Sequence, residues 1–231
     1  MFGPIKNLIF DFDGTLVDSM SSVLEGLGNA VSDHLGKEVD DLELLKSFGP
    51  APQEVLRKWL PEEKVDSAFA QWRAFEHARK PEDFAPFDGI EKMLQSLKDA
   101  NYSIGIFTGR DRPGTLRIAK AHGWLDKYFS EEHMVCGDDG FRAKPEPDAL
   151  IELLKRNQWD AKLSLMTGDH PYDVMAGRAA GLKTAAVLWD LPKGRGTHRS
   201  KFKAGWQRWD TVEVDLRLLQ PQSLTEWLVS K

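Results

Sequence analysis

A short apolar run that ends in two acidic residues places the strongest constraint on how this chain folds. The run from Leu8 to Phe10 is too short for a helix and is typical of a strand buried in a parallel sheet. It ends in Asp11-Phe12-Asp13-Gly14. Because alternate side chains of a strand point to the same face, we expect both carboxylates to face one crevice. That crevice lies at the carboxyl end of the strand, where open parallel sheets bind ligands.

Two carboxylates that face one crevice repel each other unless a cation or a proton lies between them. Asp11 and Asp13 therefore predict either a site for a hard metal ion or an acid/base pair that shares a proton. A plain turn is the alternative without a function, since Gly14 allows the chain to bend sharply. A calcium loop is excluded, because it needs its glycine sixth and a carboxylate twelfth. Counted from Asp11, the glycine is fourth and the twelfth residue is Ser22.

The composition of the 231 residues is that of an ordinary globular protein, with 41% hydrophobic and 29% charged residues. A formal net charge of −5 argues against nucleic acid as the main partner. Cys136 is the single cysteine, which excludes an internal disulfide and fits a reducing compartment. The sequence has no secretory signal pattern and no run of membrane-spanning length. We therefore expect a cytoplasmic protein without a membrane partner, and a homodimer is compatible with the sequence.

A long stretch with helical periodicity and almost no strand signal follows the first strand. Apolar residues recur at spacings of three and four from Ser19 to Leu35, and amphipathic segments follow from Asp40 to Phe48, from Pro52 and from Pro61. Pro81 to Asp88 has the composition of a loop. We therefore predict that residues 17–84 form an all-helical domain, inserted into a core made of residues 1–16 and 85–231.

From Gly89 onward the pattern alternates between helix and strand. Strands are predicted over Tyr102 to Phe107, Met134 to Cys136, Leu163 to Thr167, Thr184 to Leu188 and, at an edge, Val212 to Val214. Helices are predicted over Ile90 to Ala100, Thr115 to His122, Glu146 to Asn157, Tyr172 to Ala180 and Leu224 to Val229. Such alternation implies right-handed crossovers and a parallel sheet covered on both faces. The predicted fold class is α/β, a doubly wound parallel sheet with a Rossmann-like core and an inserted helical domain.

Polar residues follow three of the predicted strands. Asp11 and Asp13 follow the first, while Thr108 and Asp169 end two later ones. Lys144 lies in a loop before a helix on the same side of the sheet. Because the carboxyl ends of parallel strands meet at one edge, the alternation of strands and helices would bring these distant residues into one crevice.

These residues make the sequence similar to the haloacid dehalogenase superfamily, in its capped phosphatase branch. The four motifs of that family occur in order as Asp11-Phe12-Asp13-Gly14-Thr15, Thr108, Lys144-Pro145-Glu146-Pro147-Asp148, and Gly168-Asp169 with Asp173. The resemblance covers residues 8 to 188, and the helical insertion lies where such enzymes carry a mobile cap. The subgroup that the sequence resembles most is that of phosphoglycolate-phosphatase-like hydrolases.

The resemblance implies a Mg²⁺-dependent phosphatase that acts on a small phosphorylated metabolite. Asp11 would attack phosphorus and form an aspartyl-phosphate. Asp13 would protonate the leaving oxygen and then deprotonate the water that hydrolyses this intermediate. The metal ligands would be Asp11, the backbone carbonyl of Asp13 and Asp169. Asp173 would support the metal site or orient Lys144, although an ordinary carboxylate in the first turn of a helix is the plainer alternative.

Substrate binding is assigned by the same resemblance to Thr108, Gly109, Arg110 and Lys144. The Thr108 hydroxyl would donate to the phosphoryl group, and Lys144 would place a positive charge on it. Arg110 would meet a substrate anion or lie exposed on the surface. His170 follows Asp169 where the family more commonly has a small hydroxyl residue, and we expect it to pack there or to lie beside the metal ligands.

The sequence does not identify the substrate. Ser19, Ser22 and the turn Phe48-Gly49-Pro50 are the expected contacts from the helical domain. A sugar-phosphate mutase with the same chemistry is an alternative to the hydrolase. A non-catalytic polyanion-binding protein is another, because residues 191–209 contain six basic residues, no acidic ones, and both Trp206 and Trp209. A solvated loop packed by its tryptophans is the plainer interpretation of that segment.

Overall fold

The computed structural model describes residues 4–48, 51–189 and 212–229, and within them a six-stranded sheet has the order β3-β2-β1-β4-β5-β6. The strands are β1 (Asn7–Phe10), β2 (Ser103–Phe107), β3 (Met134–Val135), β4 (Ser164–Gly168), β5 (Lys183–Val187) and β6 (Leu216–Leu218). The helices are α1 (Met20–Leu35), α2 (Asp41–Leu45), α3 (Pro52–Trp59), α4 (Glu62–Ala78), α5 (Ile90–Asp99), α6 (Arg112–Ala121), α7 (Asp148–Arg156), α8 (Pro171–Ala179) and α9 (Pro221–Val229). All neighbouring strands pair in parallel, which confirms the predicted α/β class.

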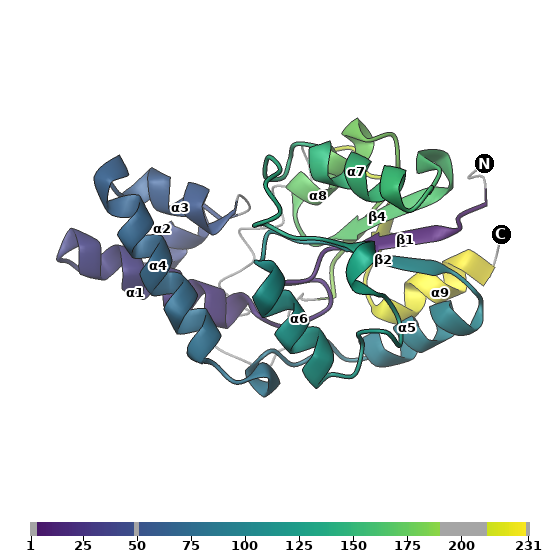
Figure 1. Cartoon of the computed structure of the whole chain (residues 1–231), viewed down its shortest axis with the longest axis horizontal. Helices are drawn as coiled ribbons and strands as arrows, with labels where there is room; N and C mark the ends of the chain where they lie inside the picture. Colours follow the sequence, from purple (N-terminus) through teal and green to yellow (C-terminus); the bar gives the residue numbers. More distant parts are fainter. Residues whose placement is uncertain (1–3, 49–50, 190–211, 230–231) are drawn as a thin grey trace.

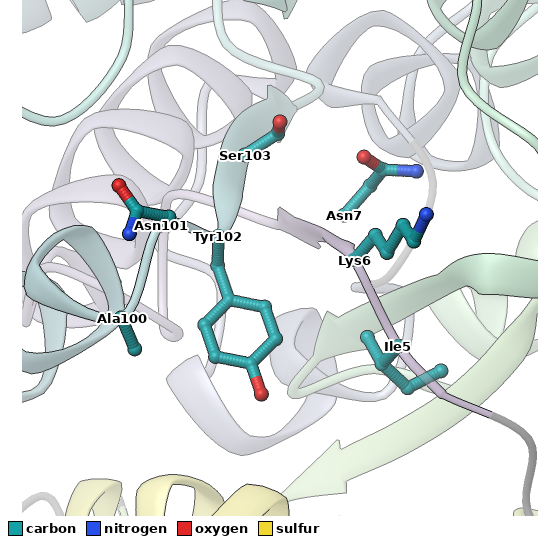
Figure 2. Close-up of a pocket in the computed structure, with 7 residues that line it drawn as sticks. All are labelled: Ile5, Lys6, Asn7, Ala100, Asn101, Tyr102 and Ser103. Carbon is teal, nitrogen blue, oxygen red and sulfur yellow. The ribbon is translucent and has the colours of Figure 1, made fainter.

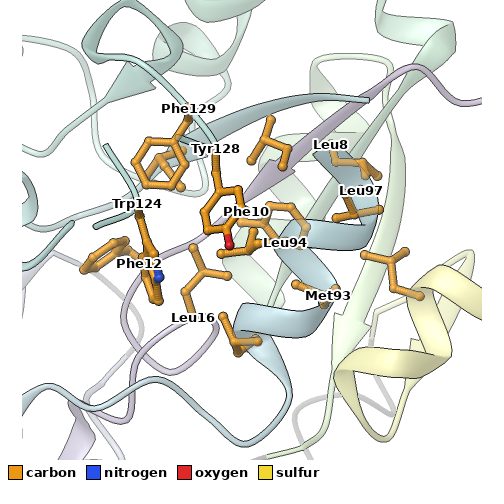
Figure 3. Packing of buried hydrophobic residues seen from close by; sticks show 14 of the residues in the cluster. Leu8, Phe10, Phe12, Leu16, Met93, Leu94, Leu97, Trp124, Tyr128 and Phe129 are labelled. Carbon is orange, nitrogen blue, oxygen red and sulfur yellow. The ribbon is translucent and has the colours of Figure 1, made fainter. Parts of the chain in front are cut away.

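Helices cover both faces of the sheet because the side chains of β1 alternate between two hydrophobic clusters. Leu8 and Phe10 belong to the cluster that also contains Met93 of α5 and Leu224 of α9. Ile9 belongs to a second cluster with residues of α7 and α8. Figure 1 shows α7 and α8 on one side of the sheet and α5 and α9 on the other. Figure 3 shows how closely the first cluster packs around β1 and α5.

The order of the strands reverses at β1, which lies between β2 and β4. Asn7 pairs with Ser103 of β2 on one side and with Ser164 of β4 on the other. The chain runs from β1 to β2 and β3 in one direction and then returns to place β4 on the opposite side of β1. In open α/β sheets, ligands bind at the carboxyl ends of the strands at such a reversal. The loops after β1 and β4 therefore lie where a site is expected.

Helices α1 to α4 share a hydrophobic cluster of their own, separate from the clusters of the sheet. Its buried residues include Leu27 and Val31 of α1, Leu56 of α3 and Trp72 of α4. These four helices lie at one end of the molecule, on the left in Figure 1. The two connections to the sheet run side by side, since the Asp18 amide donates to the carbonyl of residue 85 at 2.8 Å. These contacts support the predicted inserted domain, and its limits at residues 17 and 84 stay a prediction.

Several helices begin at other residues than the sequence pattern predicted: α8 begins at Pro171 and not at Tyr172, and α9 begins at Pro221 and not at Leu224. Helix α6 begins at Arg112 and not at Thr115, because the Asp111 carboxylate accepts a hydrogen bond from the Gly114 amide at 3.0 Å and caps the first turn. Helix α7 begins at Asp148 and not at Glu146. A residue that precedes a proline is disfavoured in helical conformation, and Glu146 precedes Pro147.

The edge strand was predicted at Val212 to Val214, and this prediction is wrong. The strand β6 is Leu216–Leu218, which pairs in parallel with β5. Val212 and Val214 instead pack against a small hydrophobic cluster around Val174, and the carbonyl of residue 213 accepts a hydrogen bond from an arginine of α8. The alternation of apolar residues reflects partial burial of these two side chains and not a pairing of the backbone.

A hollow lies at the amino ends of β1 and β2, opposite the ends from which Asp11 and Thr108 follow (Figure 2). It is lined by Ile5, Lys6, Asn7, Ala100, Asn101, Tyr102 and Ser103. This end of the sheet carries the amino ends of the strands, so the hollow lies away from their carboxyl ends. Within the described ranges, every helix is too short or too polar to cross a membrane.

The turns that follow β2 and β3 pack directly against each other. The Gly137 amide donates to the Arg110 carbonyl at 2.8 Å. A Cβ atom at Gly137 would overlap the carbonyl group of Gly109. Because that neighbour is backbone, it cannot give way by a change of rotamer, so the turn after β3 fixes the position of the turn after β2.

We expect the substitution Gly137→Ala to lower the free energy of unfolding by about 1–3 kcal/mol, which is the usual cost of overpacking. The measurement is urea unfolding followed by circular dichroism. Gly28→Ala is a matched control, because Gly28 lies in helix α1 and a Cβ atom there would meet only a side-chain atom of Leu44, at an ordinary contact distance of 3.7 Å. The control should raise stability by about 0.5–1 kcal/mol, as alanine does inside a helix. Equal stability of Gly137→Ala and the native protein would show that the two turns do not constrain each other.

Candidate active site

Asp11 and Lys144 form a buried ion pair at the carboxyl end of β1. The Lys144 Nζ atom lies 2.9 Å from Asp11 Oδ1 and 2.7 Å from Asp173 Oδ1. It also donates to the backbone carbonyl of Phe107 at 3.2 Å. An ammonium group has three N–H donors, and these three acceptors match them. Lys144 is therefore held in one position between the ends of β1 and β2 and the first turn of α8.

The negative charge around Lys144 exceeds the positive charge that it supplies. Burial raises the pKa of Asp11 to about 7, although Lys144 opposes this rise, and the nearby Asp173 and Asp13 add to it. Burial by itself would lower the pKa of Lys144, but Asp11 and Asp173 outweigh it and raise that pKa. Lys144 is thus a permanent cation, and a further cation near Asp11 would lower the pKa of this carboxyl group and favour its ionised form.

Three carboxylates lie close enough together to hold a metal ion. One oxygen each of Asp11, Asp169 and Asp173 lies within 4.8 Å of the others. The Thr15 hydroxyl donates to Asp169 Oδ1 at 2.8 Å, which orients that carboxylate. Gly14 has φ +75°, and a Cβ atom there would overlap the Asp169 carboxylate. Hard oxygen donors of this kind fit Mg²⁺, which prefers carboxylates and water as ligands.

The carboxylate of Asp13 points to Arg110 instead of joining that acidic cluster. Arg110 Nε lies 2.9 Å from Asp13 Oδ2, and its Nη2 lies 2.8 Å from Asp13 Oδ1. Burial opposes ionisation of Asp13, but the charge of Arg110, its hydrogen bonds and the Ser19 hydroxyl outweigh this and lower the pKa of Asp13. Arg110 was expected to meet a substrate anion or to lie exposed; it is 4% exposed, so the second expectation is wrong.

Arg110 has a second buried partner, Glu76 of α4, which sequence reasoning did not identify. The Arg110 Nη2 atom lies 2.9 Å from Glu76 Oε2. Glu76 is 2% exposed, and its Oε1 accepts a hydrogen bond from the Ser22 hydroxyl at 2.7 Å. The sequence did contain a signal for this buried position. Val65 and Trp72 are buried on α4 at helical spacing, and residue 76 continues the same face of the helix. A charged residue on a buried face needs a partner of opposite charge.

Thr108 and Gly109 follow β2 and lie beside these ion pairs. Thr108 is 2% exposed, and its Oγ1 accepts a hydrogen bond from the Arg110 amide at 3.1 Å. This contact satisfies a backbone donor and leaves the hydroxyl hydrogen of Thr108 to donate to another acceptor. A Cβ atom at Gly109 would meet no atom of the described chain within 4 Å, so the backbone there borders open space.

His170 and Asp173 begin helix α8, and their side chains cap it reciprocally. His170 Nδ1 accepts a hydrogen bond from the Tyr172 amide at 3.1 Å, and the His170 amide donates to Asp173 Oδ2 at 3.0 Å. The His170 ring also meets the Tyr172 ring edge-on, with 4.8 Å between centroids. Asp173 is therefore both a first-turn carboxylate and the partner of Lys144, so the two interpretations of this residue do not exclude each other.

The sequence predicted substrate contacts at Ser19, Ser22 and the turn Phe48-Gly49-Pro50, and the structure describes these segments only in part. Ser19 and Ser22 are both buried, Ser19 near Asp13 and Ser22 against Glu76. Of the turn Phe48-Gly49-Pro50, residues 49 and 50 lie outside the described residues. The basic segment 191–209 lies outside them as well.

Known proteins resemble this chain in sequence and in fold. The pyrophosphatase PpaX of Bacillus cereus (strain ATCC 10987 / NRS 248) is 29% identical over 191 residues, which are 83% of this chain and 86% of the relative. A predicted phosphatase from Clostridium acetobutylicum has a crystal structure with TM-score 0.80 at 20% identity, covering 99% of this chain and 100% of that one. A predicted phosphoglycolate phosphatase from Haemophilus somnus 129pt has TM-score 0.75 at 18% identity, covering 98% of each chain.

A candidate β-phosphoglucomutase from Bacteroides vulgatus shares the fold too, with TM-score 0.71 at 22% identity, covering 98% of this chain and 90% of that one. These structural similarities concern the fold, which is common to proteins of different activities. A sequence model described as haloacid dehalogenase-like hydrolase matches residues 8–187, which are most of the chain and include every motif residue named above. The chain belongs to the family of haloacid dehalogenase-like hydrolases.

Proposed function

We propose that this protein is a Mg²⁺-dependent phosphomonoester hydrolase that acts on a small phosphorylated metabolite through an aspartyl-phosphate at Asp11. One observation carries the proposal: the Asp11 carboxylate lies 2.9 Å from the buried Lys144 ammonium, at the edge of a three-carboxylate cluster. A nucleophile beside a fixed cation suits attack on an anionic phosphoryl group. The relative named pyrophosphatase supports phosphoryl transfer to water as the class of reaction.

In the first step, a carboxylate oxygen of Asp11 forms a bond to phosphorus while the bond from phosphorus to the ester oxygen breaks. The leaving oxygen takes a proton from the Asp13 carboxyl group and departs as an alcohol. Lys144 stabilises the charge on the phosphoryl oxygens, and the Thr108 hydroxyl donates to one of them. The products of this step are the alcohol and the aspartyl-phosphate.

In the second step, Asp13 takes a proton from a water molecule whose oxygen bonds to phosphorus. The bond from phosphorus to Asp11 breaks, which restores the Asp11 carboxylate and yields inorganic phosphate. Arg110 suits this step, because its two contacts favour the ionised Asp13 that accepts the proton. Because Arg110 lowers the pKa of Asp13, this proton passes to solvent at neutral pH, and Asp13 has to take up a proton again before the next leaving oxygen departs.

The residues that would hold Mg²⁺ are Asp11, Asp169 and Asp173, together with the backbone carbonyl of Asp13. When bound, the ion would neutralise carboxylate and phosphate charge so that an anionic nucleophile can approach an anionic ester. In the metal-free protein the rise in the pKa of Asp11 to about 7 reflects burial and the neighbouring carboxylates. This excess of negative charge is what a divalent cation at the cluster would relieve.

Replacing the nucleophile tests the proposed reaction. Asp11→Asn should reduce kcat for phosphate release by at least about 10³-fold, because an amide cannot form the acyl phosphate. The assay measures inorganic phosphate released from p-nitrophenyl phosphate, a hexose phosphate and pyrophosphate, with Mg²⁺ and with excess chelator. Asp66→Asn is the control, since Asp66 is an exposed carboxylate on α4. Full activity of Asp11→Asn or of the chelated protein would refute the proposal, and an isomerised hexose phosphate without free phosphate would indicate a mutase.

The raised pKa of Asp11 makes Mg²⁺ binding depend on pH. With a pKa of about 7, Asp11 is mostly protonated at pH 6 and mostly ionised at pH 8 in the metal-free protein. Because the ligand must lose its proton, we expect Mg²⁺ to bind roughly tenfold more tightly at pH 8 than at pH 6. Calorimetry in buffers of different ionisation enthalpy measures both the Kd and the protons released. Equal affinity at the two pH values, with no proton released, would contradict a metal ligand at Asp11.

A further inference from the structure

We propose that Glu76 of helix α4 is a positioning residue that fixes the Asp13 carboxylate through the guanidinium of Arg110. The inference rests on the proposed function, because it concerns Asp13 as the acid and base of that reaction. It adds to that function a residue from the inserted helical domain, which lies outside the four sequence motifs. Helix α4 would thus complete an active site whose reacting groups all lie on the core.

The geometry connects the three side chains in one continuous ion network. A single atom, Arg110 Nη2, lies 2.8 Å from Asp13 Oδ1 and 2.9 Å from Glu76 Oε2. The side chains of Arg110 and Glu76 are 3% and 2% exposed, while that of Asp13 is 20% exposed. Solvent therefore reaches the reacting end of the network and not the two residues behind it. A buried charge that loses its partner is costly, so these two residues hold each other in place.

Glu76 is itself fixed by contacts that do not involve the reacting groups. The Ser22 hydroxyl of α1 donates to Glu76 Oε1 at 2.7 Å, so one carboxylate oxygen faces Ser22 and the other faces Arg110. Arg117 of α6 donates to the backbone carbonyl of Glu76 at 3.1 Å. The end of α4 is thereby attached to the core helix that follows Arg110. Glu76 can act as an anchor because its own position is determined from both domains.

The guanidinium of Arg110 is confined from another side by an aromatic ring. Its Cζ atom lies 4.8 Å from the centroid of the Phe84 ring, within the range of a cation–π contact. The ring and the two carboxylates together leave Arg110 one orientation. When the charge of Glu76 is removed, Arg110 keeps its ion pair with Asp13 but loses the one with Glu76. The side chains of Arg110 and Asp13 can then move together. A displacement of about 1 Å at a reacting group can cost roughly 10²-fold in rate.

The test compares esters that differ in how much they need a proton donor. An aryl leaving group such as p-nitrophenolate departs with little protonation, whereas an alkoxide from an alkyl phosphate needs the proton of Asp13. We expect Glu76→Gln to lower kcat/KM about tenfold more for ethyl phosphate than for p-nitrophenyl phosphate. A role confined to stability would lower both values by the same factor. Equal losses, or no loss, would overturn the proposal.

Four further variants sharpen the comparison. Asp13→Asn should show the same selective loss on the alkyl ester, and Glu76→Gln should add no further selectivity when it is combined with Asp13→Asn. Added selectivity in the double variant would overturn the proposed path through Asp13. Glu63→Gln, an exposed carboxylate on the same helix, should leave both esters unaffected. If Glu76→Gln does not fold, Ser22→Ala removes the donor to Glu76 without changing any charge and should give a smaller selective loss.

The outcome for the native protein separates this inference from the proposed function. If the native protein with Mg²⁺ releases phosphate from neither ester nor from pyrophosphate, the proposed function fails. If it is active and Glu76→Gln shows no ester selectivity, the hydrolase stands and the positioning role of Glu76 is refuted.

Discussion

The site depends on one electrostatic constraint, an excess of negative charge at the carboxyl ends of β1 and β4. Asp11, Asp169 and Asp173 converge there, and Lys144 is the ammonium that contacts two of them. Lys144 does not compensate this charge fully, since burial and the neighbouring carboxylates raise the pKa of Asp11 to about 7. Buried carboxylates tolerate such proximity only when protons or cations lie between them. A divalent cation between these carboxylates would neutralise the excess of negative charge that their proximity creates.

The fold creates this concentration of charge by bringing loops close together where the strand order reverses. Two glycines are needed for it, because a Cβ atom at Gly14 would overlap Asp169 and one at Gly168 would overlap Asp173. The hydrogen bond from Thr15 then orients Asp169, and the cap of helix α8 orients Asp173. Small residues and local hydrogen bonds thus set the position of the carboxylates before any ligand arrives, which is the condition for electrostatic stabilisation of a reaction.

Positive charge at the site is divided between two buried cations with different partners. Lys144 pairs with Asp11 and Asp173, whereas Arg110 pairs with Asp13 and with Glu76 of the helical domain. The Asp11 side of the site is therefore built from the sheet and its following loops and helix. The Asp13 side reaches into α4 through Glu76 and, through Ser22, into α1. A movement of α1 and α4 would change the surroundings of Asp13, because Ser19 at the start of α1 lies beside it and Glu76 of α4 contacts its partner Arg110.

The sequence by itself determined the class of fold and the motif residues. A run that ends in Asp11 and Asp13, followed by alternating helices and strands, specifies which residues reach the carboxyl edge of a parallel sheet. Helix starts at Arg112 and Asp148 differed because capping and proline effects act locally and shift boundaries. Only the tertiary structure decided that β6 lies at Leu216–Leu218 and that Arg110 pairs with Glu76. Strand pairing and buried ion pairs join segments that are distant in the chain, and periodicity within one segment carries no information about its partner.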